Sequence, residues 1–173
     1  MRVPGAVRIG VVGPDSDGAT AEELQLAEEV GRLLAERGAT VLCGGLGGVM
    51  EAACRAAVAH GGTTVGLLPD PDDSAANPYL TVALPTGIGE LRNGLIVRAS
   101  HAVISIGGSW GTLSEIALAV RTGTPCVALR SWQIVPRGRT ASAPVPVDTA
   151  AEAVTAAYAA IGARTRPPDA EPR

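Results

Sequence analysis

The stretch TVLCGGLGGVMEAACRAAVAH, from Thr40 to His60, holds the pattern that decides the fold of this chain. Its first four residues are β-branched or apolar and suit a buried strand, and the next five are four glycines around one leucine. From Val49 onward, small and apolar residues suit a helix. The stretch therefore predicts a strand, a tight glycine turn and a helix, the unit from which parallel α/β sheets are built.

The same unit recurs on both sides of this stretch. Thr20 and Glu23 have the spacing of a capping box at the start of the first helix, and Gly38 is placed to end it. We expect a Rossmann-like α/β fold, a doubly wound parallel sheet of about six or seven strands with helices on both faces. The expected strands are 7–13, 40–43, 63–68, 80–84, 101–106 and 125–129, and the expected helices are about 21–37, 49–60, 90–99, 112–121 and 148–161.

The chain is expected to form a single Rossmann-like nucleotide-binding domain. Its 173 residues are enough for one well-packed core, and 46% of them are hydrophobic. We place this domain at residues 1–162 and expect residues 163–173 to be a disordered tail. Residues 130–146 form a loop that could close over a ligand or reach a partner subunit.

Composition excludes several classes of function. The net charge of −3 and the scattered arginines argue against binding to nucleic acid or to a membrane. The sequence has no lysine to hold pyridoxal phosphate as a Schiff base, which excludes a PLP-dependent lysine decarboxylase. We expect no cofactor and no metal site, with Cys43, Cys54 and Cys126 as buried thiols. With no signal-peptide pattern and no apolar run long enough to span a bilayer, a cytoplasmic protein is expected.

Three glycine-rich segments follow expected strands: Gly13–Gly18, Gly44–Gly48 and Gly107–Thr112. Glycine lets a backbone approach a phosphate closely, and the first amides of the next helix supply free donors and a positive dipole end. None of the three has the complete G-x-G-x-x-G spacing, which argues against hydride transfer. Glycines can also serve only as tight turns, but three such segments at one sheet edge favour a phosphate site.

The segment from Gly107 to Glu115, GGSWGTLSE, is the most specific in the chain. Thr112 and its neighbouring amides suit a phosphate, and Glu115 lies one turn into the expected helix. The same two residues have capping-box spacing, so they could instead cap that helix. The sequence leaves both roles open.

Two motifs in this order resemble those of the LOG (Lonely Guy) family. Residues 44–50, GGLGGVM, resemble its G-G-x-x-G-x-M segment, and residues 107–115 resemble its P-G-G-x-G-T-x-x-E motif. Arg92 stands at the spacing of the family's catalytic arginine. The resemblance covers about residues 8–129, and it extends to molybdenum-cofactor carrier proteins and more distantly to the DNA-processing protein DprA. LOG proteins are phosphoribohydrolases of cytokinin nucleoside monophosphates, and relatives were often labelled lysine decarboxylases.

The resemblance implies a role for each matched residue. Arg92 and Glu115 would be catalytic, with Glu115 steadying the developing charge on the ribose or activating water, and Arg92 orienting that carboxylate or the ribose. Arg92 could also be a solvated helix arginine, and Arg98 is expected at the surface or between subunits. Trp110 would cover the site or pack at a subunit contact. The residues expected to bind phosphate or nucleotide are Gly13, Ser16, Gly44, Gly45, Gly47, Gly48, Met50, Gly107, Gly108, Ser109, Gly111 and Thr112.

Three positions depart from the LOG pattern. Gly107 replaces its proline, Ser109 replaces its second glycine, and Asn93 replaces the lysine that follows the arginine. These departures favour a non-catalytic carrier or sensor of a nucleotide-like ligand such as molybdopterin.

Retention of Arg92 and Glu115 instead favours hydrolysis of the N-glycosidic bond of a purine or cytokinin nucleoside 5′-monophosphate. A pocket that both residues face would favour this hydrolase further. The acidic charge and the scarcity of aromatic residues disfavour a DNA-processing function. The family also implies a homodimer or higher homo-oligomer, through the helices expected at 90–99 and 112–121.

Overall fold

The computed structural model describes residues 6–135 and 144–165. They form a sheet of seven parallel strands in the order β4-β3-β2-β1-β5-β6-β7, the Rossmann-like α/β fold that the sequence predicts. The strands are β1 (Arg8–Val12), β2 (Thr40–Cys43), β3 (Thr63–Leu68), β4 (Val82–Pro85), β5 (Ala102–Ile106), β6 (Cys126–Leu129) and β7 (Val145–Val147). The helices are α1 (Ala21–Glu36), α2 (Val49–Ala59), the 3₁₀ helix η1 (Gly89–Arg92), α3 (Asn93–Ala99), α4 (Trp110–Thr122) and α5 (Ala150–Thr165).

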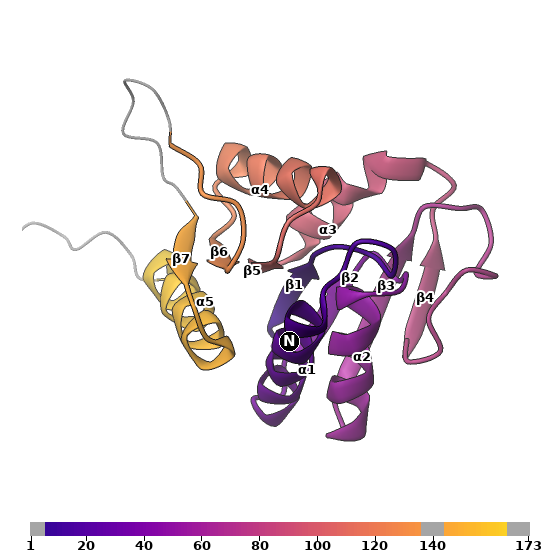
Figure 1. The fold of residues 1–173 in the computed structure, drawn as a ribbon, viewed down its shortest axis with the longest axis horizontal. Coiled ribbons are helices and arrows are strands. Elements are labelled where there is room, and N and C mark those ends of the chain that lie inside the picture. The colour runs from indigo at the N-terminus through magenta and orange to yellow at the C-terminus, as the bar shows by residue number, and fades with distance from the viewer. Residues whose placement is uncertain (1–5, 136–143, 166–173) are drawn as a thin grey trace, which may run out of the picture.

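Helices cover both faces of the sheet (Figure 1). Helices α1, α2 and α5 lie on one face, and α3 and α4 lie on the other. The larger core contains Val30 and Leu34 of α1 with Ile104 of β5, and the smaller core contains Ile96 of α3 with Ile116 of α4. Because the central strands are buried on both sides, their sequences are nearly continuous apolar runs.

The order of the strands reverses between β1 and β5. Strand β1 pairs with β2 on one side and with β5 on the other. The chain therefore builds the sheet outward from β1 to β4 and then returns to build outward from β5 to β7. In such sheets a crevice forms beyond the carboxyl ends of the strands at the reversal, here just after Val12 and Ile106.

Local signals at the start of the chain act as the sequence predicts. Thr20 caps α1, since its hydroxyl accepts from the Glu23 amide while the Glu23 carboxylate accepts from the Thr20 amide at 2.7 Å. Gly38, which follows α1, has a φ of 68°, a conformation that glycine adopts without strain. Cys43, Cys54 and Cys126 are buried free thiols, as expected.

Two strands at the sheet edges differ from the prediction. Strand β4 begins at Val82 rather than at residue 80, because side-chain bonds hold the residues before it. The Thr64 hydroxyl donates to the Tyr79 carbonyl at 2.6 Å and accepts from the Thr81 amide at 2.8 Å. Strand β7 lies where the prediction has a loop. Pro146 at its centre has no amide hydrogen for a neighbouring strand, which argues against a strand in the sequence. At the edge of a sheet this missing donor is tolerated.

Two helices differ as well. The helix expected at 90–99 is divided into η1 and α3. Helix α5 continues to Thr165, so the prediction of a disordered tail is wrong for residues 163–165. This helix was expected to end near residue 161, but it continues through Gly162, because glycine inside a helix costs only about 1 kcal/mol. The rest of the expected tail, 166–173, and part of the expected loop, 136–143, lie outside the described residues.

In the part of the chain that the structure describes, every helix is too short or too polar to span a bilayer.

Candidate functional site

A cavity of about 360 Å³ lies at the β1–β5 reversal, beyond the carboxyl ends of the strands. Seven of the residues expected to bind or act on a ligand line it, from the first and third glycine-rich segments, η1, α2 and α4. The lining residues are Val12, Gly13, Pro14, Asp15, Gly18, Leu46, Met50, Pro69, Glu90, Arg92, Asn93, Ser109, Gly111, Thr112 and Glu115.

The third glycine-rich segment brings the N-terminus of α4 to this cavity. Ser109 is the N-cap residue, and its hydroxyl accepts from the Thr112 amide at 3.2 Å. The Trp110 and Gly111 amides, in the first turn, have no carbonyl one turn earlier to bond. The alternative in which Thr112 and Glu115 cap the helix is wrong, because α4 starts two residues before Thr112. This helix end offers donors and a positive dipole to an anion in the cavity.

Arg92 and Glu115 face each other across the cavity. Arg92 ends η1 and is 9% exposed, and Glu115 lies in the second turn of α4 and is 5% exposed. Arg92 Nη1 lies 3.8 Å from Glu115 Oε1, an ion-pair separation beyond hydrogen-bond distance. The alternative of a solvated helix arginine at position 92 is therefore wrong.

Burial dominates the electrostatics of this pair. Desolvation raises the pKa of Glu115 to about 8, even though the Arg92 charge opposes the rise. Desolvation also lowers the pKa of Arg92, against the favourable charge of Glu115. At neutral pH the Glu115 carboxyl consequently favours its protonated form, which can donate a hydrogen bond.

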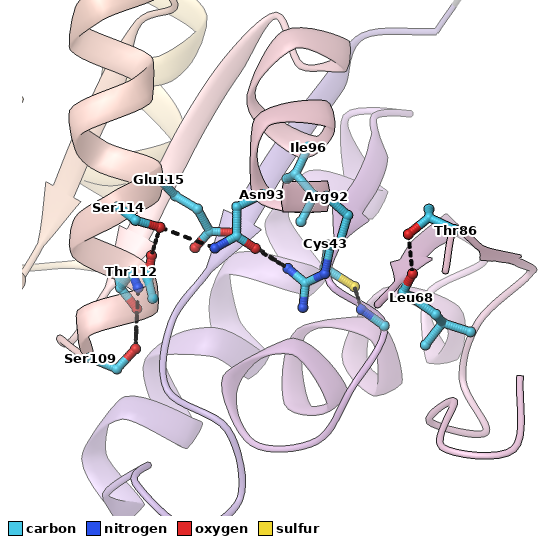
Figure 2. A network of polar contacts seen from close by, with 12 residues as sticks. Cys43, Leu68, Thr86, Arg92, Asn93, Ile96, Ser109, Thr112, Ser114 and Glu115 are labelled. Carbon is cyan, nitrogen blue, oxygen red and sulfur yellow. Dashed lines mark hydrogen bonds and ion pairs between the residues drawn. The ribbon is translucent and has the colours of Figure 1, made fainter. Parts of the chain in front are cut away.

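Asn93 links the arginine to α4 (Figure 2). Arg92 Nη1 donates to Asn93 Oδ1 at 2.5 Å, and Asn93 Nδ2 donates to Ser114 Oγ at 3.1 Å. Ser114 Oγ in turn donates to the Gly111 carbonyl at 2.7 Å. A chain of hydrogen bonds thus connects the guanidinium to the first turn of α4, where the free amides lie.

The second glycine-rich segment mainly supports the site. A side chain at Gly44 would meet the guanidinium of Arg92, with its Cβ 2.6 Å from Nη2. Gly48 has a φ of 62° and lies against the backbone of Pro14 and Asp15. The first amide of α2, that of Val49, donates to the Pro14 carbonyl at 3.0 Å and is therefore not free for a ligand.

Among the residues expected to bind a ligand from this part of the chain, Met50 lines the cavity, together with the neighbouring Leu46. Gly44, Gly45, Gly47 and Gly48 are not among the lining residues.

Three other expected residues lie beside the cavity rather than in its wall. A side chain at Gly108 would meet the Trp132 indole, and one at Gly107 would meet Glu23, so both glycines serve close packing. Ser16 is exposed in the loop after β1 and lines a separate cavity of about 190 Å³.

The two aromatic residues near the site pack on each other. Trp110 is 78% exposed, and its ring centroid lies 5.5 Å from that of Trp132. Trp132 Nε1 donates to the Ser109 carbonyl at 3.1 Å, which fixes this pair at the start of α4. Trp110 is not among the residues that line the cavity, and Arg98 is exposed on α3.

Several lining residues were not singled out from the sequence. Asp15 follows the first glycine, and Pro69 follows the last residue of β3, so the rule that ligands bind beyond strand ends could have identified both. Glu90 lies two residues before Arg92 and Asn93 directly after it, and no motif marks them. Asn93 was noted only for its departure from the LOG pattern.

Comparisons with known proteins agree with this architecture. A protein of Archaeoglobus fulgidus described as uncharacterized is 40% identical over 124 residues, which cover 72% of this chain and 80% of that protein. The molybdenum cofactor binding protein of Rippkaea orientalis has a TM-score of 0.84 at 30% identity, covering 92% of this chain and 99% of that one. The molybdenum cofactor carrier protein of Chlamydomonas reinhardtii has a TM-score of 0.81 at 29% identity, covering 91% and 99%.

DprA of Helicobacter pylori shares the fold alone, with a TM-score of 0.64 at 19% identity, covering 86% of this chain and 79% of that one. The relationship expected from the two glycine motifs is therefore confirmed. The SLOG cluster4 family model matches residues 6–157, from the start of the sheet through the first half of α5. The chain belongs to the SLOG cluster4 family.

Proposed function

We propose that this protein binds a nucleotide-like ligand with a single phosphoryl group in the cavity at the β1–β5 reversal, and that it acts as a carrier of that ligand. One observation carries the proposal. The cavity combines the free first-turn amides of α4 with the Arg92–Glu115 pair in a single space. In this proposal the α4 amides bind the phosphate, and Arg92 and Glu115 contact the rest of the ligand.

The charge of the lining limits the ligand. Arg92 is the one positive side chain among the described lining residues, whereas Asp15, Glu90 and Glu115 carry carboxyl groups. A triphosphate would bring more negative charge than this wall can neutralise. A monophosphate needs only the helix N-terminus and one guanidinium.

The apolar part of the wall suits a flat ring system. Val12, Leu46, Met50 and Pro69 supply apolar surface for a ring face. The carboxyl groups can accept from ring N–H groups. Purines and pterins both combine these features, and the similar Rippkaea orientalis and Chlamydomonas reinhardtii proteins are described as binding or carrying the molybdenum cofactor. This likeness supports a pterin-type cargo.

Paired substitutions at Gly111 test the phosphate position. A Cβ at Gly111 would have only Ser109 Oγ near it, at 3.6 Å, so side chains are tolerated there. We expect Gly111→Asp to weaken AMP binding at least tenfold by calorimetry, because a carboxylate then occupies the anion site. Gly111→Asn has the same shape without the charge and should bind several-fold more tightly than the aspartate variant.

Equal affinities of the two Gly111 variants for AMP would contradict a phosphate at this helix end. Titrations with AMP, ADP and ATP complete the test, with Arg98→Ala on the exposed side of α3 as the control that should bind as wild type does. Preference for ATP over AMP would contradict a site for a single phosphoryl group.

A second candidate is a phosphoribohydrolase, and the shared cavity of Arg92 and Glu115 favours it. Water would add across the N-glycosidic bond of a purine nucleoside 5′-monophosphate, giving free base and ribose 5-phosphate. Because Glu115 holds its proton at neutral pH, its carboxyl would donate that proton to the leaving base. This role differs from the carboxylate role that the LOG resemblance implies.

Release of base and ribose 5-phosphate from AMP and from N6-prenylated AMP separates the two candidates. Turnover by the wild type that is lost in Glu115→Gln would establish the hydrolase. Saturable binding without turnover in either protein would leave the carrier.

We further propose a homodimer formed through α3 and α4, in a reducing compartment such as the cytoplasm. Leu91 in η1, just before α3, and Trp110, the first residue of α4, are 79% and 78% exposed, and apolar surface of this kind favours association. The three free thiols fit a reducing compartment. Light scattering of the wild type and of Leu91→Glu tests the dimer, and a monomeric mass for the wild type would contradict it.

A further inference from the structure

The Arg92 guanidinium is held by an amide rather than by its carboxyl partner. Nη1 donates to Asn93 Oδ1 at 2.5 Å, whereas Glu115 Oε1 lies 3.8 Å from the same nitrogen. A charged donor usually prefers a carboxyl oxygen within reach. Another contact therefore keeps the Arg92 guanidinium from forming a direct hydrogen bond with Glu115.

The orientation of the Asn93 amide follows from its other neighbour. The Ser114 hydroxyl has a single hydrogen, which it donates to the Gly111 carbonyl. Ser114 Oγ can therefore only accept, so the nitrogen of the Asn93 amide must face it. The oxygen of the amide is then left to face Arg92, which has donors only. The first turn of α4 thus sets the direction of the amide (Figure 2).

The other side of the guanidinium rests on Gly44. No Cβ is present there, and one would lie 2.6 to 2.8 Å from three guanidinium atoms. Arg92 Nε is buried and has no hydrogen-bond partner among the described residues. The amide of Asn93 and the bare backbone of Gly44 are therefore the contacts that fix where the guanidinium lies.

We propose that Asn93 is a positioning residue of this site, which holds the Arg92 guanidinium off Glu115 so that both groups face the ligand. The ligand contact in this inference rests on the proposed function, whereas the separation of the two groups does not. Without the amide, Nη1 is free to bond Glu115 directly and the two groups satisfy each other.

The protonation of Glu115 reports this separation. The charged or titratable groups that face the pair are Cys43 of β2, Cys126 of β6 and Glu90 of η1. Burial raises the pKa of Cys126 to about 12, so its thiol stays neutral near pH 7. A direct bond from Arg92 would lower the pKa of Glu115, as a close opposite charge does for carboxyl groups.

The experiment compares the full-length wild type with Asn93→Leu and Asn93→Asp. Carboxyl ¹³C NMR follows the titration of Glu115, whose signal is identified by its loss in Glu115→Gln. We expect the Glu115 midpoint to fall by about one pH unit or more in Asn93→Leu. It should not fall in Asn93→Asp, which keeps an oxygen for Arg92 and adds a negative charge. AMP affinity should fall about tenfold in the leucine variant.

An unchanged midpoint in Asn93→Leu, or an equal fall in both variants, would overturn the inference, because a merely structural asparagine gives one of these results. AMP binding separates this inference from the proposed function. If the wild type fails to bind AMP, the proposed function fails, while the Glu115 midpoint still decides whether Asn93 separates the pair.

Discussion

At Glu115 burial and ion pairing act in opposite directions, and burial prevails. The carboxyl is 5% exposed, and the guanidinium that would favour its charge stands 3.8 Å away. Its pKa rises to about 8 from an ordinary value of 4.5. Below pH 4.5 both the folded and the unfolded chain hold this proton. Between pH 4.5 and 8 only the folded chain holds it, so folding stability falls as pH rises through this range.

Substitution of Glu115 by glutamine should remove this pH dependence. Each pKa unit corresponds to about 1.4 kcal/mol, so the wild type should lose a few kcal/mol of stability relative to Glu115→Gln between pH 5 and pH 8. Urea unfolding at several pH values measures this loss. Glu90→Gln, which removes a carboxyl from the exposed rim of the cavity, should keep the wild-type profile. Parallel profiles for wild type and Glu115→Gln would show that the buried carboxyl is ionised throughout.

Gly44 is a second residue at which one substitution should change ligand binding with little effect on folding stability. Its φ is not in the left-handed region, so alanine fits the backbone, but the new methyl group would displace the end of the Arg92 side chain. We expect Gly44→Ala to fold with stability within about 1 kcal/mol of wild type and to bind AMP at least tenfold more weakly.

The matched control for Gly44 is Gly94→Ala in α3, where a Cβ would meet no atom within 4 Å. Calorimetry and thermal unfolding of both variants are the measurements. Unchanged AMP affinity in Gly44→Ala would show that the position of Arg92 does not matter for the ligand.

At the scale of elements, the N-terminus of α4 contributes both to folding stability and to ligand binding. The Ser109 hydroxyl fixes the Thr112 amide, and Trp132 fixes the Ser109 carbonyl, so the first turn is held with its free amides toward the cavity. At the corresponding end of α2, the first amide, that of Val49, already donates to the Pro14 carbonyl.

Removal of the α4 cap should therefore affect both properties. We expect Ser109→Ala to lower stability by about 0.5–2 kcal/mol and to weaken AMP binding. Thr20→Ala removes the capping hydroxyl of α1 from a residue that is not in the cavity wall, and it should cost similar stability without any loss of affinity. Equal affinities of the two variants in titration calorimetry would show that the α4 terminus does not contact the ligand.

The sequence predicted elements well where local chemistry decides them and less well where distant contacts do. Short apolar runs predicted β1, β2 and β3 closely, and a capping box predicted the start of α1, because these signals act within a few residues. Strand β7 depends on pairing with β6 across a long connection, and its proline conceals it. Ser109 as the N-cap was missed because Thr112 and Glu115 have the spacing of a capping box three residues later.

Prediction of the site also succeeded for residues in local motifs and failed for contacts between distant segments. The motif residues Arg92, Thr112 and Glu115 were predicted, and the fold brings them to one cavity. Most glycines of the second segment support backbone and side-chain packing instead, which composition could not distinguish from ligand contact. The roles of Asn93 and Gly44 toward Arg92 follow from distances between segments far apart in the sequence, and such distances require the fold.

At the scale of the whole molecule, the reversal of strand order decides where a ligand can bind. It brings the ends of β1 and β5 together with η1 and α4, which are separated by many residues along the chain. A larger groove of about 540 Å³ runs along β7 and α5, but its walls offer no buried ionisable pair among the described residues. Chemistry rather than size therefore selects the smaller cavity.

The most direct test of this assignment is an NMR titration of the ¹⁵N-labelled protein with AMP. The amide signals of Trp110 and Gly111 should shift strongly and saturate together with that of Gly13, while those of Ala151 and Ala156 in the β7–α5 groove stay in place. Shifts centred on the β7–α5 groove, or no saturable shift at the start of α4, would contradict a phosphate site at the β1–β5 reversal.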